Sequence, residues 1–141
     1  LYSSAASDVY KRQDLMKSGP VAETYQKVCD GLDGILAKHG YHREGRLYRT
    51  KQHNEDTIVL FCHMGVTFYM LSHLLSISPV CLNHTMFLPP SSVTVVSTEE
   101  VEQGYGMFRT QMLGDTSHLY CAGEPVSHMG YFAEILQERP L

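Results

Sequence analysis

The sequence predicts an α/β fold in which helices flank a mostly parallel sheet. Three observations lead to this class: a helical apolar stripe, an uninterrupted apolar run at residues 57–62, and a second helical pattern directly after that run. An apolar run without alternation is typical of a central parallel strand, because helices cover both of its faces. The chain of 141 residues has room for one domain.

A helix is expected over residues 21–39. Apolar residues recur there at spacings of three and four, which draws one stripe along a helix. Pro20 suits the first helical position, and Gly40 suits the stop. Gly31 and Gly34 each weaken a helix by roughly 1 kcal/mol relative to alanine, so this one must depend on packing.

Residues 41–50 read as extended structure with a turn at Glu44-Gly45. Basic residues gather in and just after this stretch, and a solvated face is the expected role for such a short charge cluster: Arg43, Arg46, Arg49 and Lys51. Further along, residues 78–87 fit either a short helix or a loop.

A hairpin is predicted from a strand at residues 93–96 and a second strand at 106–113, joined by an acidic connection. A last short helix is expected over residues 127–137. Residues 1–13 show no helical or strand period and read as a poorly ordered or non-native tail. Residues 14–141 are then expected to be part of a single domain.

Composition excludes several functions. The net charge of −4 leaves no basic face for nucleic acid. None of the four cysteines forms a Cys-x-x-Cys pair, and we expect Cys29 and Cys62 to pack as small hydrophobic residues in a reducing, cytoplasmic compartment. No apolar run approaches the roughly 20 residues of a membrane span, and no signal peptide is evident.

The end of the predicted 57–62 strand is the candidate site. In open α/β sheets, ligands bind beyond the carboxyl ends of the strands. His63 lies there, and the helix beginning near Gly65 would point its free N–H groups and its positive dipole end at the same place, which favours phosphate. A cationic imidazole could offset charge that builds during phosphoryl transfer. By spacing alone, a single histidine after an apolar strand is more often structural than catalytic.

Three segments together resemble the histidine phosphatase superfamily, whose fold is phosphoglycerate-mutase-like. They read Thr57-Ile-Val-Leu-Phe-Cys-His-Met-Gly-Val, then Pro89-Pro-Ser-Ser-Val-Thr, then Asp115-Thr-Ser-His-Leu. The match spans about residues 20–137. It implies a mostly parallel sheet that is incomplete at its N-terminus, a small phosphorylated substrate and no cofactor.

The resemblance implies that His63 is the second catalytic histidine and that Met64 and Gly65 form the phosphate-facing turn. Met64 departs from the commoner glycine. His118 matches a residue that we interpret as structural. The family's nucleophile lies in an Arg-His-Gly motif, which is absent from this sequence, and its general acid and second phosphate-binding arginine have no assigned counterpart. We therefore expect these 141 residues alone to have no phosphatase activity.

Three other functions are alternatives to a histidine phosphatase. A metal site would draw on eight histidines, but no His-Glu-x-x-His or Cys/His ladder is present, so we expect no metal. A cysteine phosphatase needs an arginine six residues after the cysteine, and none of the four has one. The third is a degenerate phosphatase-like domain that binds a phosphorylated ligand or partner.

Without its neighbouring strand, the 57–62 strand would leave an unpaired edge and favour self-association.

Overall fold

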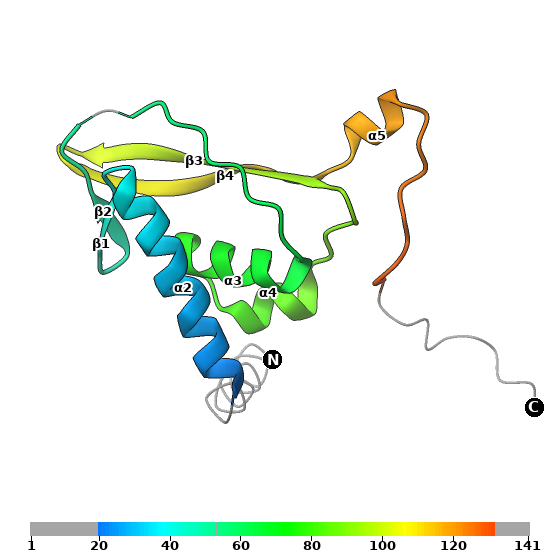
Figure 1. Ribbon diagram of the computed structural model, residues 1–141, viewed down its shortest axis with the longest axis horizontal. Helices are drawn as coiled ribbons and strands as arrows, with labels where there is room; N and C mark the ends of the chain where they lie inside the picture. The colour runs from blue at the N-terminus through cyan, green and yellow to red at the C-terminus, as the bar shows by residue number, and fades with distance from the viewer. Residues whose placement is uncertain (1–19, 53, 132–141) are drawn as a thin grey trace, which may run out of the picture.

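The computed structural model describes residues 20–52 and 54–131, which form a mixed α/β unit with one antiparallel sheet. Helix α2 (Pro20–Lys38) comes first, and the short strands β1 (His42–Glu44) and β2 (Leu47–Arg49) follow it. Helices α3 (Met64–Leu75) and α4 (Pro79–Thr85) come next. Strands β3 (Val93–Glu102) and β4 (Tyr105–Asp115) form a long hairpin, and α5 (Ser117–Cys121) lies beyond it (Figure 1).

The four strands are ordered β1-β2-β4-β3, and every pairing is antiparallel. Tyr48 of β2 lies opposite Gly106 of β4, which joins the small hairpin to the large one. Gly45 has a φ of 63° in the β1–β2 turn, and Gly104 has a φ of 79° in the β3–β4 turn, so both turns use the left-handed region that glycine enters without strain. These contacts confirm the predicted hairpin and the predicted extended stretch with its turn at Glu44-Gly45.

Packing of α2 and α3 against the sheet and α4 produces the core. One cluster joins Leu32 and Leu36 of α2 to Tyr48 and Phe108 of the sheet. A second cluster holds four residues from α3, α4 and the segment before β3, namely Phe68, Leu71, Leu82 and Leu88. Cys29 is buried in α2, as expected for a cysteine that packs as a small hydrophobic residue.

The predicted helix at 21–39 is confirmed with Pro20 as its first residue, and Gly40 follows it with a φ of 87°. The helix after His63 is confirmed as α3. The ambiguous stretch at 78–87 contains a helix, α4, which has a proline at its start. The hairpin strands run further than expected, because Glu99, Glu100 and Glu102 belong to β3 rather than to a connection.

The prediction of a mostly parallel sheet is wrong for the described residues, because their sheet is antiparallel. Residues 57–62 form no strand and cross the molecule as an unpaired segment between β2 and α3 (Figure 1). A strand needs a neighbouring backbone to pair with, and β3 and β4 pair with each other instead. The run of apolar side chains is present, but its partner is not among the described residues.

One other expectation fails near the C-terminal end. The helix predicted at 127–137 is absent from its described part, residues 127–131, and the remainder lies outside the described residues. A helix forms earlier, at α5, where the Asp115 carboxylate accepts hydrogen bonds from the Ser117 amide at 3.2 Å and hydroxyl at 2.6 Å. The expected tail at residues 1–13 also lies outside the described residues.

Candidate functional site

His63 lies between the extended segment and helix α3. It is the N-cap residue, with φ −89° and ψ 158°, and its side chain makes no capping hydrogen bond. The ring is exposed, and among the described residues no hydrogen bond or ion pair engages it. The histidine is therefore neither a packed core residue nor a satisfied structural one. Its imidazole is available to a ligand.

The first turn of α3 leaves backbone donors beside His63. The first helical hydrogen bond runs from the Thr67 amide to the His63 carbonyl at 3.0 Å, so the amides of Met64, Gly65 and Val66 have no intrahelical acceptor. A Cβ placed on Gly65 would meet nothing within 4 Å, which leaves the approach to this backbone open. These amides and the helix dipole favour an anion.

Thr67 braces the turn from within the helix. Its hydroxyl donates to the His63 carbonyl at 3.1 Å and lies 3.2 Å from the Cys62 thiol. Cys62 is exposed, so the expectation that it packs as a small hydrophobic residue is wrong. The difference from buried Cys29 arises because the segment that carries Cys62 pairs with no strand.

Few charged side chains are assigned to the turn at residues 63–65. The first turn of α3 contains no acidic residue. Arg43 donates to the Tyr48 hydroxyl and the His73 carbonyl, and Arg49 donates to Glu44. These two arginines are therefore engaged elsewhere. Arg46, Arg49 and Lys51 are exposed, as expected for a solvated face, whereas Arg43 is partly buried. Nothing in the described contacts assigns a phosphate-binding arginine to His63.

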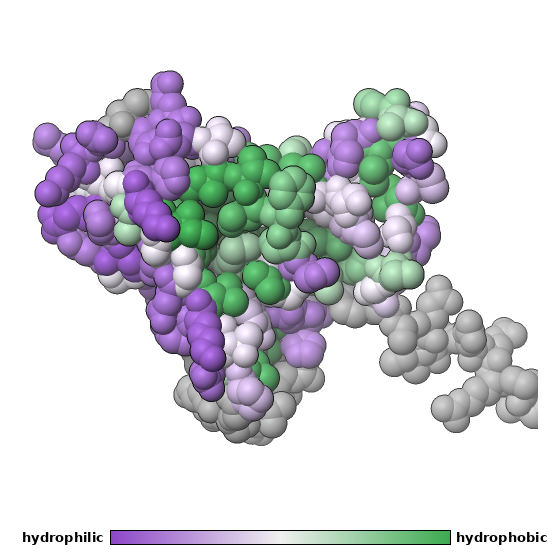
Figure 2. All heavy atoms as spheres, viewed as in Figure 1, coloured by the Kyte–Doolittle hydropathy of each residue, from purple (hydrophilic) through white to green (hydrophobic). Residues whose placement is uncertain are grey.

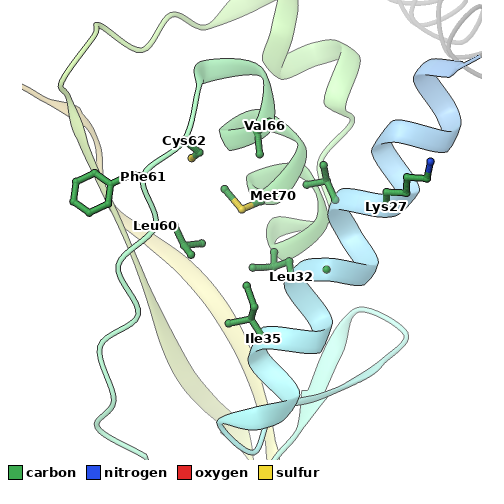
Figure 3. Close-up of a pocket in the computed structure, with 10 residues that line it drawn as sticks. Lys27, Leu32, Ile35, Leu60, Phe61, Cys62, Val66 and Met70 are labelled. Carbon is green, nitrogen blue, oxygen red and sulfur yellow. The ribbon is translucent and has the colours of Figure 1, made fainter.

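An apolar groove of about 280 Å³ lies next to the turn, between the extended segment and helices α2 and α3 (Figure 3). Leu60, Phe61 and Cys62 line one side, and Val66 and Met70 of α3 line another. Leu32 and Ile35 of α2 complete the apolar wall. His63 does not line this groove, so the groove and the candidate phosphate turn are neighbouring but separate features.

His118, the other histidine of the matched motifs, lies in α5 and is exposed. Its side chain makes no hydrogen bond or ion pair among the described residues, so its predicted structural role finds no support. The structure thus brings together His63, Met64 and Gly65, which are consecutive, and leaves His118 on a separate helix.

A polar network that no sequence motif indicates joins α2, α3 and the small hairpin. The Tyr48 hydroxyl donates to Asp33 at 2.8 Å and accepts from Arg43 at 2.9 Å. The other Asp33 oxygen lies 2.9 Å from Nε2 of His73. Burial raises the pKa of Tyr48 well above its usual range, so the phenol stays protonated and serves as a donor. The members of this network satisfy one another, which is typical of a structural network rather than a ligand site.

Within the described residues, no group of three histidine, cysteine, aspartate or glutamate side chains could hold a metal ion. In the same part of the chain, no helix has the length and apolar character needed to cross a bilayer. Comparison with family models, curated proteins and solved structures gives no significant match. The function must therefore be argued from the site and the sequence motifs.

Proposed function

We propose that residues 63–65 contribute a phosphate site to a phosphoryl-transfer domain of the histidine phosphatase type. The domain would hydrolyse or transfer a small phosphomonoester through a phosphohistidine. One observation supports this best: the exposed ring of His63, which has no hydrogen bond among the described residues, lies beside helix amides that lack an intrahelical acceptor. The order of the three sequence motifs supports it independently.

In this proposal His63 stabilises charge and does not attack. An attacking imidazole nitrogen forms a bond to phosphorus while the substrate oxygen leaves with a proton, and water later cleaves the nitrogen–phosphorus bond. His63 and the amides of Met64 and Gly65 would donate to the phosphoryl oxygens while negative charge builds on them. The same imidazole cannot do both, so a second histidine is required.

The nucleophile would come from an Arg-His-Gly element outside these 141 residues. Its strand would lie parallel to residues 57–62 and give that segment the neighbour it lacks. Recovery of the reading frame upstream of residue 14 tests this part directly, because the motif must appear there.

A degenerate domain that binds a phosphorylated ligand without turnover is the second candidate. It requires only the exposed ring of His63 and the amides that lack an intrahelical acceptor, and no nucleophile. Both candidates predict phosphate binding at residues 63–65, and the upstream reading frame separates them.

We expect the 141-residue chain to release no p-nitrophenol from p-nitrophenyl phosphate above the buffer rate. The reason is that the chain contains one candidate imidazole and no Arg-His-Gly motif. Turnover by the purified chain that disappears in His63→Ala would contradict the assignment of His63 as a supporting group.

Binding is tested separately from turnover. Titration with inorganic phosphate should shift the NMR signals of the His63 ring and of the Met64 and Gly65 amides. His63→Gln should remove these shifts, whereas His118→Gln, which changes another exposed histidine in the first turn of a helix, should not. Equal shifts at both histidines would mean nonspecific anion binding and would refute the proposed site.

A further inference from the structure

Residues 57–62 have the side-chain alternation of a strand although they pair with no other strand among the described residues. The odd positions point outward, with Val59 68% and Phe61 97% exposed, whereas Ile58 and Leu60 at the even positions are 37% and 45% exposed. Leu60 lines the apolar groove and is drawn toward it in Figure 3. Successive side chains on opposite faces are the pattern of extended β backbone.

The backbone of this segment is also unused. Within the described part of the chain, none of the backbone amides or carbonyls of residues 57–62 takes part in a hydrogen bond. The segment carries no charge, proline or glycine, the features with which proteins block pairing at strand edges. Figure 2 shows hydrophobic side chains gathered on the face that this segment crosses.

We propose that residues 57–62 form an antiparallel strand pair with the same residues of a second copy of this chain. Two-fold symmetry requires such a pair to be centred on one residue, and we place Val59 there. Val59 then faces Val59 of the second copy, and Ile58 faces its Leu60. Apolar side chains meet at both of these positions, and cross-strand apolar pairs stabilise antiparallel strands.

Charge complementarity selects this register and direction. With Val59 at the centre, Glu55 lies opposite His63 of the second copy, and symmetry forms this carboxylate–imidazole pair twice. A parallel pair in the same register would instead place Glu55 beside Glu55, which is unfavourable. Moving the centre to Leu60 would place Thr57 opposite His63 and remove the charge match.

The second copy is a better occupant than the free edge of β3 on another molecule. Three glutamates lie toward the end of β3, which deters pairing at that edge: Glu99, Glu100 and Glu102. A contact between the segment and β3 would also be heterologous and would continue into open chains, whereas the pair centred on Val59 closes on itself. A six-residue strand pair is smaller than the roughly 800 Å² per partner of a standard interface, so the dimer should dissociate on dilution.

Sedimentation across a wide concentration range should show a monomer–dimer equilibrium. Val59→Asp places two carboxylates opposite each other on the symmetry axis and should leave only monomer. Val101→Asp makes the same change at an exposed valine of β3 and should leave the dimer intact. A chain that is monomeric at every concentration, a dimer unaffected by Val59→Asp, or assemblies larger than the dimer would each overturn the proposal.

Cross-linking tests the register. In a background with the exposed cysteines replaced (Cys62→Ser, Cys121→Ser), oxidised glutathione should join two Val59→Cys chains by a disulfide. Leu60→Cys should cross-link poorly, because the two sulfur-bearing positions are diagonal and too far apart. Equal cross-linking of both variants would rule out the Val59-centred pair.

This inference does not rest on the proposed phosphate site. Because the dimer places Glu55 next to His63 of the second copy, the phosphate titration should also be run on monomeric Val59→Asp. Failure to bind phosphate there counts against the proposed function alone, and failure to dimerise counts against the strand pair alone.

Discussion

Helix α3 and the segment that leads into it are both apolar, but they differ in how far their side chains are buried. Phe68 of α3 is fully buried, whereas Phe61 of the segment is 97% exposed. A helix satisfies its own backbone and needs only a surface to pack on, and α2, α4 and the hairpin provide that surface. A strand needs another backbone as well, and residues 57–62 have none among the described residues. Apolar composition therefore marks a segment for burial but does not ensure it.

The largest effect should separate these two phenylalanines. Phe68→Ala removes a buried ring between α3 and α4 and should cost about 3–5 kcal/mol of unfolding free energy. Phe61→Ala removes an exposed ring and should change the unfolding free energy of the monomer by less than about 0.5 kcal/mol. Urea denaturation at low chain concentration measures both, and Phe68→Leu serves if the alanine variant does not fold.

Similar losses in the two variants would contradict the comparison, because Phe61 would then be packed in the monomer. A large loss for Phe61→Ala that appears only at high concentration would instead agree with pairing between two copies, because dimer formation adds concentration-dependent stability.

The same contrast explains which elements could be predicted from the sequence. Helix α2 and the two hairpins are specified by neighbours in the chain, through the apolar stripe that begins after Pro20 and the glycines at the turns. The position of residues 57–62 in a sheet depends on a segment distant in sequence, and local patterns carry no information about whether that segment is present. Helix α5 could have been found, because Asp115, Thr116 and Ser117 are residue types that favour helix starts.

The polar residues in and around the candidate site also differ in how far they could be predicted from the sequence. The position of His63 at a helix start follows from a local pattern, the change from an apolar run to a helical period. The network around Asp33 does not, because its members come from α2, α3, β1 and β2 and are brought together only by the fold. Residues that meet only in the folded structure have no regular spacing in the sequence, so no sequence motif identifies such a network.

That network gives the next largest prediction. Tyr48→Phe keeps the buried ring but removes the hydroxyl between Asp33 and Arg43, so it should cost about 1–3 kcal/mol of unfolding free energy. Tyr41→Phe is the matched control, because its hydroxyl contacts Thr98 at 3.3 Å in an exposed position and its loss should cost less than about 0.5 kcal/mol. Chemical denaturation measures the unfolding free energy of both variants and so compares the two losses. If they lose equal stability, the network around Asp33 does not hold α2, α3 and the small hairpin together.

The smallest effect concerns the tether of the exposed segment. Just before residue 57, Asp56 accepts a hydrogen bond from Nδ1 of His39 at 2.7 Å, and Asn54 donates to the His39 carbonyl, so the segment is fixed to the end of α2. The hydrogen bond from His39, with a further contribution from Asn54, holds the pKa of Asp56 below its usual range. A carboxyl group whose pKa is lower in the folded state adds stability above its unfolded pKa, roughly 3.9, and loses it as the pH falls through the folded value.

Asp56→Asn should therefore lower the urea midpoint slightly near neutral pH, and its difference from the unsubstituted chain should vanish in acid. Glu124→Gln removes an exposed carboxylate that has no side-chain hydrogen bond among the described residues, and it should leave the midpoint unchanged at either pH. A difference for Asp56→Asn that persists undiminished in acid would mean that the tether does not act through the ionised carboxylate. The segment would then be held at residue 56 by packing or by its backbone, and its position beside α2 would be independent of pH.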